Sequence, residues 1–306
     1  VPGHEPIRIT GIVQDVRARH EGAQFDTDVF LVDRGVLPVD TAVAAQVVAT
    51  RFEPEVFVPP MPGIAAFRAG NAPHLLQVFE VGTATMMAAK GAIVPVATVM
   101  ANANEPFDPK AYLPTVTGYY TDMQGNMLSF PFNSSTVMFY INKDAFKKAG
   151  LDPNKPPRTW KEVLAASEKL KASGQECVYT TSWPSWMHIE NFSAWHNVPI
   201  GTKQNGMGGL DAQFTINSPL HVRHIAMLGD MAKKGLFTYA GRTNQGDAKF
   251  SSGECAMFSG SAGAQAGIKK AAKFDWSINF IPYHDDVAGA PQNSIIGGAS
   301  VWVMSG

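Results

Sequence analysis

Apolar positions from residue 61 onward switch between helical and strand-like spacing. The stretch GIAAFRAGNAPHLLQVFEVG predicts a short helix, a turn at Gly70–Asn71 that tolerates left-handed backbone, and a buried strand over residues 75–79. Alternation of helix and strand predicts an α/β fold with a parallel sheet, in which ligands bind at the carboxyl ends of strands. Glu80 stands at such an end and is a candidate ligand residue, although one Glu after a strand is also typical of a solvated loop.

A polar cluster, Asn133 to Thr136, runs directly into the apolar, strand-like residues Val137 to Tyr140. One interpretation is an Asx/Ser turn that stops a strand, because Asn and Ser side chains hydrogen-bond the neighbouring backbone. The other interpretation is binding, because small hydroxyl groups can donate to ligand oxygens without filling a cleft. The local pattern alone favours the turn.

Two amphipathic helices are predicted in the second half of the chain. Thr159 and Glu162 form a capping box that starts the first of them. The second covers residues 219–235, and we expect four of its apolar side chains to face the core: Val222, Ile225, Leu228 and Met231. His221 and His224 share a face of this helix without a carboxylate or Cys at ligand spacing, so they are predicted to be surface histidines.

Three of the six tryptophans, Trp183, Trp186 and Trp195, fall within 13 residues. Pro184 breaks any regular element between the first two. Tryptophans in such a loop are harder to bury than tryptophans on a helix face and more often form the walls of a ligand site. The segment therefore predicts an aromatic wall, with packing in the core as the alternative.

A strand-like segment, Cys255 to Phe258, leads through the small residues Ser259 to Gly263 into a predicted helix. Such a turn exposes backbone N–H groups at the positive end of the helix dipole, which suits an anion. This signal is weak alone, because many strand–helix turns are rich in Gly and Ser.

The chain has two cysteines, Cys177 and Cys255, both in apolar, strand-like segments. They lack the spacing of a zinc site. If their strands are neighbours, the pair can form a disulfide, which would indicate an oxidising compartment. Two buried free thiols are the alternative, and a Cα separation above about 7 Å would exclude the bridge.

Composition and motifs exclude several classes of protein. The 306 residues carry 25 Lys and Arg against 26 Asp and Glu, a net charge of -1, so no basic excess marks a nucleic-acid surface. No apolar run approaches the roughly 18 residues of a membrane span. There is no P-loop, HExxH or GxGxxG motif, and Ser261 lacks the glycine of a nucleophile elbow. We therefore expect no cofactor, no metal and no catalysis.

The composition changes sharply near residue 60. Residues 1–60 contain 12 Val but no Lys, Ser, Asn, Tyr, Trp, Met or Cys, whereas residues 61–306 contain 16 Lys and 14 Asn. At that rate, roughly four Lys would be expected in the first 60 residues. A Val-rich domain edge and an out-of-frame translation joined near residues 61–63 both explain the change. We expect residues 1–60 to pack poorly or irregularly against lobe one, residues 61–141, and a well-packed βαβ start with its own core would count against the out-of-frame explanation.

Several motifs from about residue 63 to 306 resemble one protein family. They are GIAAFRAGNAPHLLQVFEVGTATMM, LPTVTGYY, PFNSSTVMFYINKDAFKKAGLDP, PPRTWKEV, ENFSAW and QNSIIGGASVWVM, and they occur in order. The chain is similar to the extracellular solute-binding proteins of ABC importers that take glycerol-3-phosphate, which are related to maltose-binding proteins. The resemblance implies two α/β lobes, joined by hinge strands, that close on a ligand like a clamshell.

The resemblance also implies which residues contact the ligand. Matched motif by motif, the family's ligand positions fall on Glu80, Ser135, Trp183, Trp186, Ser261 and Gly298. A Tyr of the family's N-terminal pattern, and a Tyr and an Arg further along, have no counterpart within residues 1–306. Because Arg is the natural phosphate partner, we expect the chain to bind weakly or not at all. The apolar strand pattern that stops at VWVMSG also predicts a truncation at the C-terminus.

The resemblance further implies a domain organisation and a transport function. Residues 61–141 form lobe one, 142–293 lobe two and 294–306 a returning hinge strand. The protein captures sn-glycerol-3-phosphate or a glycerophosphodiester such as glycerophosphocholine in the cleft, is periplasmic, and docks on the membrane permease of an ABC importer. An oligosaccharide-binding protein of the same fold is the first rival. A glycosidase-like hydrolase is the second, and would need another carboxylate about 5–9 Å from Glu80.

Overall fold

The computed structural model describes residues 31–32, 47–48, 62–89, 91–206, 208–209 and 211–305. The irregular packing expected of residues 1–60 therefore lies outside the described residues. Within that segment the structure describes only two short strands, residues 31–32 and 47–48, which pair with each other. By their contacts, the residues divide into unit 1 (1–134 and 298–306) and unit 2 (135–297). The lobe boundaries expected at 141 and 293 stay predictions. Two strands, β5 (Phe130–Asn142) and β10 (Ile296–Met304), contain the points where the chain passes from one unit to the other.

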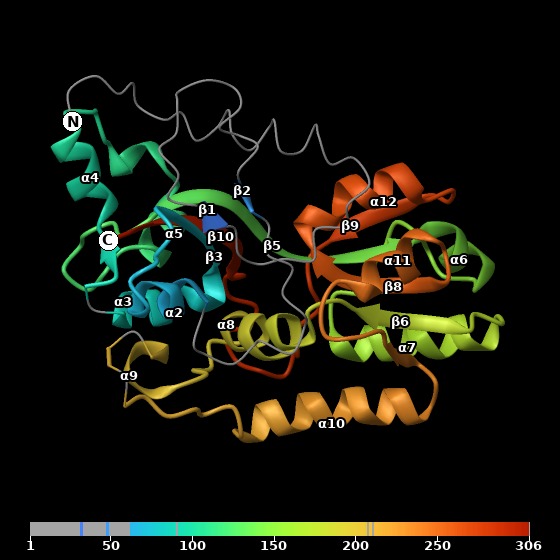
Figure 1. The fold of residues 1–306 in the computed structure, drawn as a ribbon. Helices are drawn as coiled ribbons and strands as arrows, with labels where there is room; N and C mark the ends of the chain where they lie inside the picture. Colours follow the sequence, from blue (N-terminus) through green and yellow to red (C-terminus); the bar gives the residue numbers. More distant parts are fainter. Residues whose placement is uncertain are drawn as a thin grey trace. The chain divides into compact units, whose positions relative to one another are not determined.

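Unit 1 contains short elements around one antiparallel sheet (Figure 1). Its strands are β1 (Leu31–Val32), β2 (Val47–Val48), β3 (Leu75–Phe79), β4 (Ile93–Val94) and parts of β5 and β10. Its helices are α2 (Pro62–Arg68), α3 (Thr83–Ala88), α4 (Val96–Asn102) and α5 (Pro114–Tyr119), with 3₁₀ turns η2 (Glu80–Gly82) and η3 (Pro109–Ala111). The helix–turn–strand prediction for residues 64–80 is confirmed.

The pairing of β3 differs from the expected parallel sheet. Both of its neighbours among the described strands, β1 and β10, run antiparallel to it. The returning strand β10 lies against the whole of β3, with Trp302 opposite Leu76. Leu76 and Trp302 are fully buried together with Met86 and Leu128, so this pairing builds the core of unit 1. A local helix–strand pattern cannot reveal a partner that arrives more than 200 residues later.

Unit 2 is larger and holds the longer elements. Its strands are the second part of β5, then β6 (Cys177–Thr181), β7 (Phe237–Tyr239), β8 (Cys255–Ser261) and β9 (Trp276–Asn279). Its helices are α6 (Lys143–Lys148), α7 (Trp160–Ala172), α8 (Asn191–Trp195), α9 (Thr202–Asn205), α10 (Pro219–Lys233), α11 (Gln245–Ser251) and α12 (Gln265–Ala271). A π-helical turn, η4 (Trp186–Glu190), precedes α8, and a 3₁₀ turn, η5 (Ala262–Ala264), precedes α12.

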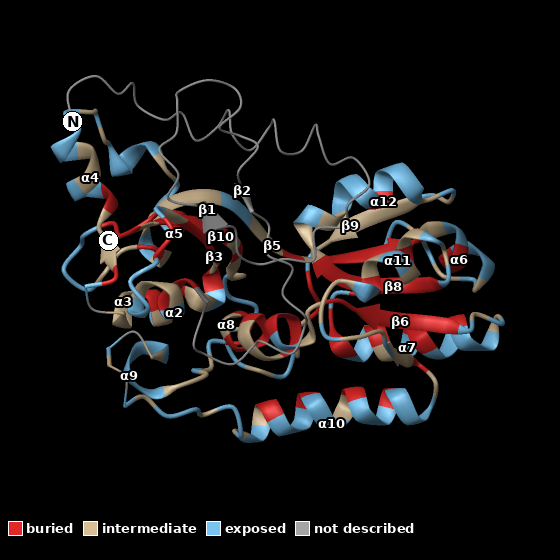
Figure 2. Ribbon diagram, viewed as in Figure 1, coloured by how far each residue is buried: buried red, intermediate tan, exposed pale blue. Residues whose placement is uncertain are grey.

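The sheet of unit 2 is covered on both faces. β8 pairs parallel with β6, which pairs parallel with β7, whereas β5 is antiparallel to β8 and β9. Successive side chains of a strand point to opposite faces. Phe139 and Ile141 accordingly pack with α7 and α10, whereas Tyr140 packs with Phe250 of α11 and Ile268 of α12. The central strands are buried throughout (Figures 1 and 2).

Local capping signals place two helices of unit 2 as the sequence predicts. The Thr159 hydroxyl accepts the Glu162 N–H at 3.1 Å, and the Glu162 carboxylate accepts the Thr159 N–H at 3.1 Å, which confirms the capping box of α7. Asn142, the last residue of β5, accepts two backbone N–H groups and starts α6. Strand and helix are thereby joined without a loop.

The orientation of α10 corrects the expectation from its apolar pattern. Val222 is 57% exposed and Ile225 45% exposed, whereas His221 and His224, expected on the surface, are buried. The helix turns its histidines inward because polar groups of other segments bond them. His224 lies 3.1 Å from His188 and 3.3 Å from His284, and His221 lies 2.8 Å from the Ser193 hydroxyl. α10 has 15 residues, and none of the described helices is long and apolar enough to cross a membrane.

The two cysteines form a disulfide. Cys177 and Cys255 are opposite each other on the parallel neighbours β6 and β8, with Cα atoms 4.5 Å apart. The bridge therefore joins the starts of two central strands. The alternative of two free thiols is wrong.

Candidate functional site

In unit 1, the buried carboxylate of Glu80 is fixed by the returning strand. Glu80 follows β3 directly and is 9% exposed, so a solvated loop carboxylate is not what forms. Its Oε2 accepts the N–H of Gly298 at 3.0 Å. The next N–H, of Ala299, donates to Oδ1 of Asn133 at 2.9 Å. Two predicted ligand residues, Glu80 and Gly298, are thus brought together by β10.

Gly298 is a position where only glycine fits. Its φ of 128° lies in the region that L side chains rarely adopt. A Cβ added there would lie 2.3 Å from the backbone oxygen of Asn133. The close approach of β10 to Asn133 is what allows the Gly298 N–H to reach Glu80.

The surroundings of Glu80 are aromatic and hydroxylic. Tyr119 donates through its hydroxyl to the Glu80 backbone oxygen at 3.3 Å. Burial raises the pKa of the Tyr120 phenol far above its ordinary value, and the negative charge of Glu80 raises it further. Tyr120 is therefore a neutral hydroxyl beside an anionic group.

In unit 2, two predicted serines meet. The hydroxyls of Ser135 on β5 and Ser261 at the end of β8 are 2.5 Å apart. Ser261 Oγ also accepts the N–H of Gly263 at 3.0 Å, and its backbone oxygen accepts the Tyr140 hydroxyl at 2.8 Å. The pair stands at the carboxyl end of β8, where α/β sheets present ligand groups.

The cluster from Asn133 to Thr136 lies inside β5 rather than in a turn. Strand pairing with β8 begins at Val137, and the Ser135 hydroxyl bonds Ser261, so Ser135 belongs to unit 2 although it was expected on lobe one. Thr136 Oγ1 contacts Ser294 Oγ at 2.9 Å. The polar side chains therefore take part in specific contacts, which the turn interpretation does not require.

The two candidate wall tryptophans lie in one cluster. Trp186 is buried with Val137 and Met187, and Trp183 packs against that cluster. Trp186 lies on the π-helical turn η4, a geometry common at functional sites. Its indole N–H is buried with no hydrogen-bond partner among the described residues. A Cβ at Gly297 would meet the Trp186 ring at 2.5 Å, so glycine there makes room for the indole.

Trp195, the third tryptophan of the segment, belongs to the core. It is buried beneath the sheet of unit 2, and its indole N–H donates to the backbone oxygen of Ile281 at 3.2 Å. Packing therefore explains Trp195 fully, whereas an unpartnered N–H remains on Trp186.

A 3₁₀ turn separates Ser261 from the helix that was expected after Gly263. A 3₁₀ turn, η5, follows Ser261, and α12 starts at Gln265. Ser261 itself satisfies one of the first N–H groups, that of Gly263. Hydroxyl groups, rather than the end of a long helix, are what this corner offers to a ligand.

Two functional candidates were missed by sequence reasoning: Ser182 and Asp247. Ser182 is buried just before Trp183 and donates to Oδ1 of Asp247 at 2.6 Å. Burial raises the pKa of the Asp247 carboxyl. No local sequence pattern links Ser182 to Asp247, because they are 65 residues apart. Gly246, beside Asp247, is a residue type that allows two backbone segments to approach closely.

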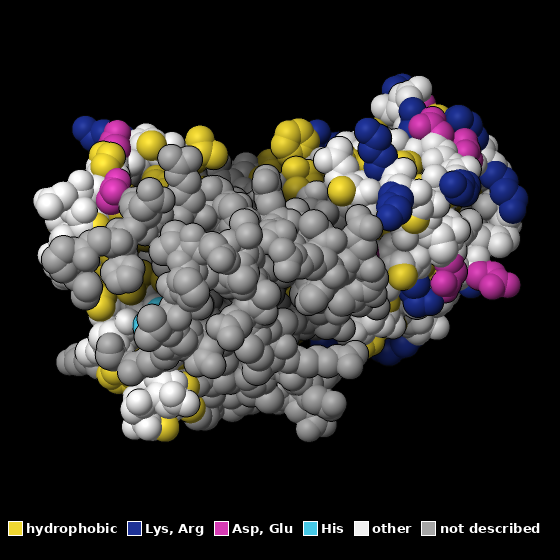
Figure 3. Space-filling view, turned by 45° about the horizontal axis from the view of Figure 1, so that its top comes forward, with side chains coloured by type: hydrophobic (Ala, Val, Ile, Leu, Met, Phe, Trp, Pro, Cys, Tyr) yellow, Lys and Arg dark blue, Asp and Glu magenta, His cyan; other side chains and the backbone are white. Residues whose placement is uncertain are grey.

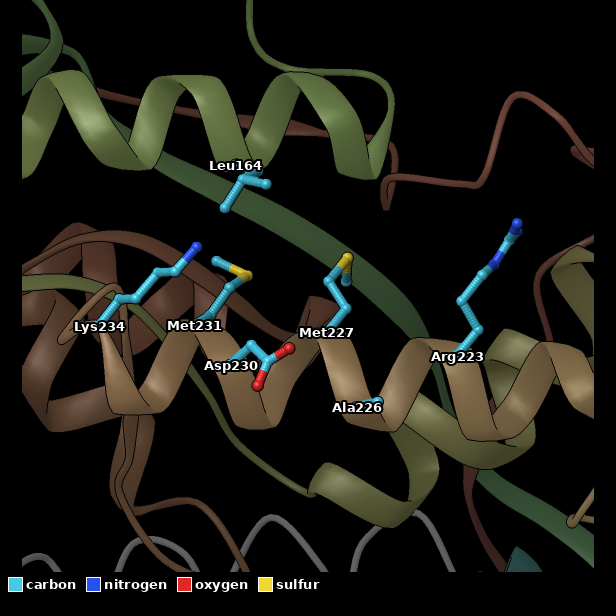
Figure 4. Close-up of a pocket in the computed structure, with 7 residues that line it drawn as sticks. All are labelled: Leu164, Arg223, Ala226, Met227, Asp230, Met231 and Lys234. Carbon is cyan, nitrogen blue, oxygen red and sulfur yellow. The ribbon is translucent and has the colours of Figure 1, made fainter.

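The two cavities described in unit 2 lie along α10. One, of about 370 Å³, is a groove between α7 and α10, and Figure 4 shows Met227 and Met231 directed from α10 toward Leu164. The other, of about 350 Å³, is apolar and lies between α10 and the chain after β6. Neither is lined by a predicted ligand residue, so the candidate site rests on hydrogen bonds and packing instead.

Charges of both signs mix on the visible described surface of unit 2 (Figure 3). Lys147 lies 3.2 Å from Asp144, and Lys143 lies 3.4 Å from Asp275. Such exposed pairs contribute little to stability.

The α/β units, with polar and charged side chains at the ends of their strands, are typical of proteins that bind small ligands. Residues 61–306 match the sequence model of the bacterial extracellular solute-binding proteins, and the chain belongs to this family. It is similar to the sn-glycerol-3-phosphate-binding periplasmic protein UgpB of Yersinia pestis bv. Antiqua (strain Antiqua), with 55% identity over 245 residues. The match covers 80% of this chain and 56% of the relative. UgpB of Salmonella typhimurium (strain LT2) is 54% identical with the same coverage.

Solved structures of the same fold agree. UgpB from Mycobacterium tuberculosis in complex with glycerophosphocholine has a TM-score of 0.63 and 21% identity, and the match covers 79% of this chain and 60% of that one. Maltose-bound T. maritima MalE3 has a TM-score of 0.61 and 16% identity, with the same coverage. The predicted two-lobed solute-binding fold is confirmed. The chain spans a little over half the length of the curated relatives that it matches.

Proposed function

We propose that the chain is the substrate-binding part of an ABC importer and captures sn-glycerol-3-phosphate or a glycerophosphodiester such as glycerophosphocholine. The observation that carries the proposal is the 55% identity over 245 residues to a relative named for binding sn-glycerol-3-phosphate. The solved structure of Mycobacterium tuberculosis UgpB with glycerophosphocholine supports the fold. Its ligand, glycerophosphocholine, is the second candidate ligand proposed for this chain.

The roles proposed for the site residues follow from their chemistry. The indoles of Trp183 and Trp186 form a wall for the glycerol carbons, and the unpartnered Trp186 N–H donates to a ligand oxygen. The hydroxyls of Ser135 and Ser261 bond the phosphate. The Glu80 carboxylate accepts from a ligand hydroxyl, with Gly298 holding it in place.

The remaining parts of the proposal concern setting and mechanism. Binding without catalysis fits a family defined by solute binding. A periplasmic location and docking on the permease subunits of an ABC importer are proposed from the periplasmic relatives. A ligand that binds the closed form more tightly than the open one would shift the protein toward closure.

Calorimetric titration tests the proposal. The 306-residue chain is titrated with sn-glycerol-3-phosphate, glycerophosphocholine, maltose and trehalose, up to millimolar ligand. We expect heat of binding only with the two phosphate ligands. Trp186→Ala should weaken their binding about fivefold or more, because a buried stacking wall contributes more than ~1 kcal/mol.

The matched control is Phe280→Ala, which removes an aromatic ring of unit 2 that is 62% exposed. It should leave the affinity unchanged. Binding of maltose or trehalose without the phosphate ligands would replace the proposal with the oligosaccharide alternative. Full affinity in Trp186→Ala would show that the site is misplaced.

A further inference from the structure

Trp183 holds an unfavourable backbone conformation. Its φ of 49° lies in the left-handed region, which a bulky side chain with a Cβ rarely adopts. Such a residue stays in place only where its surroundings fix it, and such positions cluster at ligand sites. The question is therefore which groups fix Trp183.

Three hydrogen bonds fix the chain at Ser182 and Trp183. The N–H of Ser182 donates to the backbone oxygen of Ser259 at 3.0 Å, and the N–H of Trp183 donates to that of Thr243 at 2.8 Å. The Ser182 hydroxyl donates to Oδ1 of Asp247 at 2.6 Å. The first bond comes from the neighbouring strand β8, whereas the other two come from the turn that starts α11.

The turn reaches this position because residue 246 is glycine. A Cβ at Gly246 would lie 2.6 Å from the backbone oxygen of Thr181 and 2.9 Å from Oγ of Ser182. Asp247 is thereby brought beside the end of β6. Burial raises the pKa of Tyr140, and the charge of Asp247 raises it further. Tyr140 in turn bonds the backbone of Ser261.

Asp247 thus bonds the residue directly before one of the candidate wall tryptophans. Its charge also acts on Tyr140, which donates to the backbone oxygen of Ser261. A carboxylate that is half-buried among hydroxyl groups requires their hydrogen bonds, because burying an unbonded charge is unfavourable. It therefore acts as a strong and directional acceptor.

We propose that Asp247 is a positioning residue for ligand binding, holding the Trp183 wall in its left-handed conformation through Ser182. The inference rests on the proposed role of Trp183 as a wall of the site. Asp247 makes no contact with the ligand itself. Without the Ser182–Asp247 bond, the backbone at Trp183 relaxes and the indole leaves the position that stacks on the ligand.

The first arm of the test needs no ligand. Hydrogen exchange of the Trp183 amide is followed by NMR in the full chain and in the variants Asp247→Ala, Asp247→Asn and Ser182→Ala. We expect about tenfold faster exchange or more in Asp247→Ala and Ser182→Ala, since a hydrogen bond to a charged group is lost in each. Asp247→Asn should restore much of the protection, because its amide oxygen can still accept from Ser182.

The matched control is Asp230→Ala, which removes an exposed acidic residue of unit 2 at the end of α10. Its exchange pattern should equal that of the unchanged chain. The proposal is overturned if exchange of the Trp183 amide is unchanged in Ser182→Ala. It is also overturned if amide exchange becomes equally faster throughout the core of unit 2, because that result indicates general destabilisation. Ser182→Ala keeps the test decisive if Asp247→Ala does not fold.

The second arm is the titration with sn-glycerol-3-phosphate. We expect about fivefold weaker binding or more in Asp247→Ala and Ser182→Ala, with partial recovery in Asp247→Asn, as for the loss of an interface side chain. Full affinity combined with faster Trp183 exchange would overturn the positioning role. If the unchanged chain binds none of the phosphate ligands, the proposed function fails, whereas the exchange arm still reports whether Asp247 holds Trp183.

Discussion

The contact between Gly298 and Asn133 shows how much a single residue can decide at the candidate site. The backbone at Gly298 is left-handed, and a Cβ would lie 2.3 Å from the Asn133 oxygen, so any side chain requires β10 to move. Such a movement would also break the Gly298–Glu80 bond. Packing and ligand presentation therefore depend on the same glycine.

We expect Gly298→Ala to lower the free energy of unfolding by about 2–4 kcal/mol, because strain at a special φ adds to the steric clash. Urea denaturation followed by circular dichroism measures the change. Gly118→Ala, on the exposed face of α5 with nothing near its Cβ position, is the control and should be neutral or stabilising by up to about 1 kcal/mol. Equal denaturation midpoints of Gly298→Ala and the unchanged chain would contradict the prediction.

At the residue scale, sequence reasoning succeeded where the signal was local and failed where it was not. The capping box at Thr159 and Glu162 involves neighbours three residues apart, so its residue types were enough. Glu80 was a candidate from its place after a strand, but its role as a ligand residue, like that of Ser261, was assigned only through a resemblance between whole motifs. Ser182 and Asp247 carry no local signal, because each is an ordinary polar residue until the fold places them 2.6 Å apart.

Among the elements, the strands β6 and β8 carry the disulfide and one of the candidate ligand residues. Cys177 and Cys255 join the starts of these parallel strands, and Ser261 stands at the carboxyl end of β8. The bridge closes a loop of 78 residues. It therefore restrains the unfolded chain without touching the candidate site.

The double variant Cys177→Ala/Cys255→Ala should lose about 4 kcal/mol of stability, the value that the chain-entropy model gives for a loop of this length. Chemical denaturation with and without reductant measures it. Reductant should lower the stability of the unchanged chain and leave the double variant unaffected. If the two proteins unfold at the same denaturant concentration, the bridge does not contribute to stability.

Helix α10 shows why an element can be predicted correctly and still be oriented wrongly. Its helical period and length were evident, and Leu228 and Met231 are buried as expected. Val222 and Ile225 are exposed instead, because the adjoining face carries His221 and His224, which bond groups on other elements. Hydrophobicity ranks histidine as polar, and its capacity to satisfy both ring nitrogens in a core is visible only in three dimensions.

For the molecule as a whole, the sequence pattern indicated an α/β fold, and the resemblance to a family specified two lobes. Patterns alone could not give the return of β10 to β3, which makes unit 1 discontinuous in sequence. Nor could they show that imidazoles from four separate segments gather in unit 2. That gathering gives the whole chain a pH-dependent stability.

The buried imidazoles form part of one directed chain of hydrogen bonds. Ser259 donates to Thr181, so the hydroxyl of Tyr179, 2.7 Å away, must donate to Ser259. The Tyr179 hydroxyl then accepts from Nε2 of His188. In the same direction, Nδ1 of His188 accepts from Nε2 of His224, and Nδ1 of His224 accepts from Nε2 of His284. His188 and His224 use both ring nitrogens in this chain, so each holds one proton, and a second proton on either would place two donors face to face.

Burial lowers the pKa of His188 to about 3 and, together with the charge of Arg223, that of His284 to about 4. Burial also lowers the pKa of His224, His196 and His221. At His196, the charge of Arg223 lowers the pKa further and that of Asp286 raises it. In the unfolded chain the same groups protonate near pH 6.5. The unfolded state thus binds more protons below that pH, and stability falls as the pH is lowered.

We expect full stability above about pH 6.5 and a loss of up to about 1.4 kcal/mol per pH unit for each histidine that protonates on unfolding. Urea denaturation at intervals between pH 7.5 and about 5 tests this, because carboxylates of ordinary pKa remain largely charged over that range. His74→Gln, in an exposed position of unit 1, is the control and should unfold as the unchanged chain does at each pH. His224→Gln, which interrupts the chain, should be less stable at pH 7.5 and should show a shallower fall toward acid, because one buried group no longer gains a proton on unfolding. A free energy of unfolding that stays constant from pH 7 to pH 5 would contradict the prediction, because it would mean that the imidazoles gain protons equally in the folded and the unfolded protein.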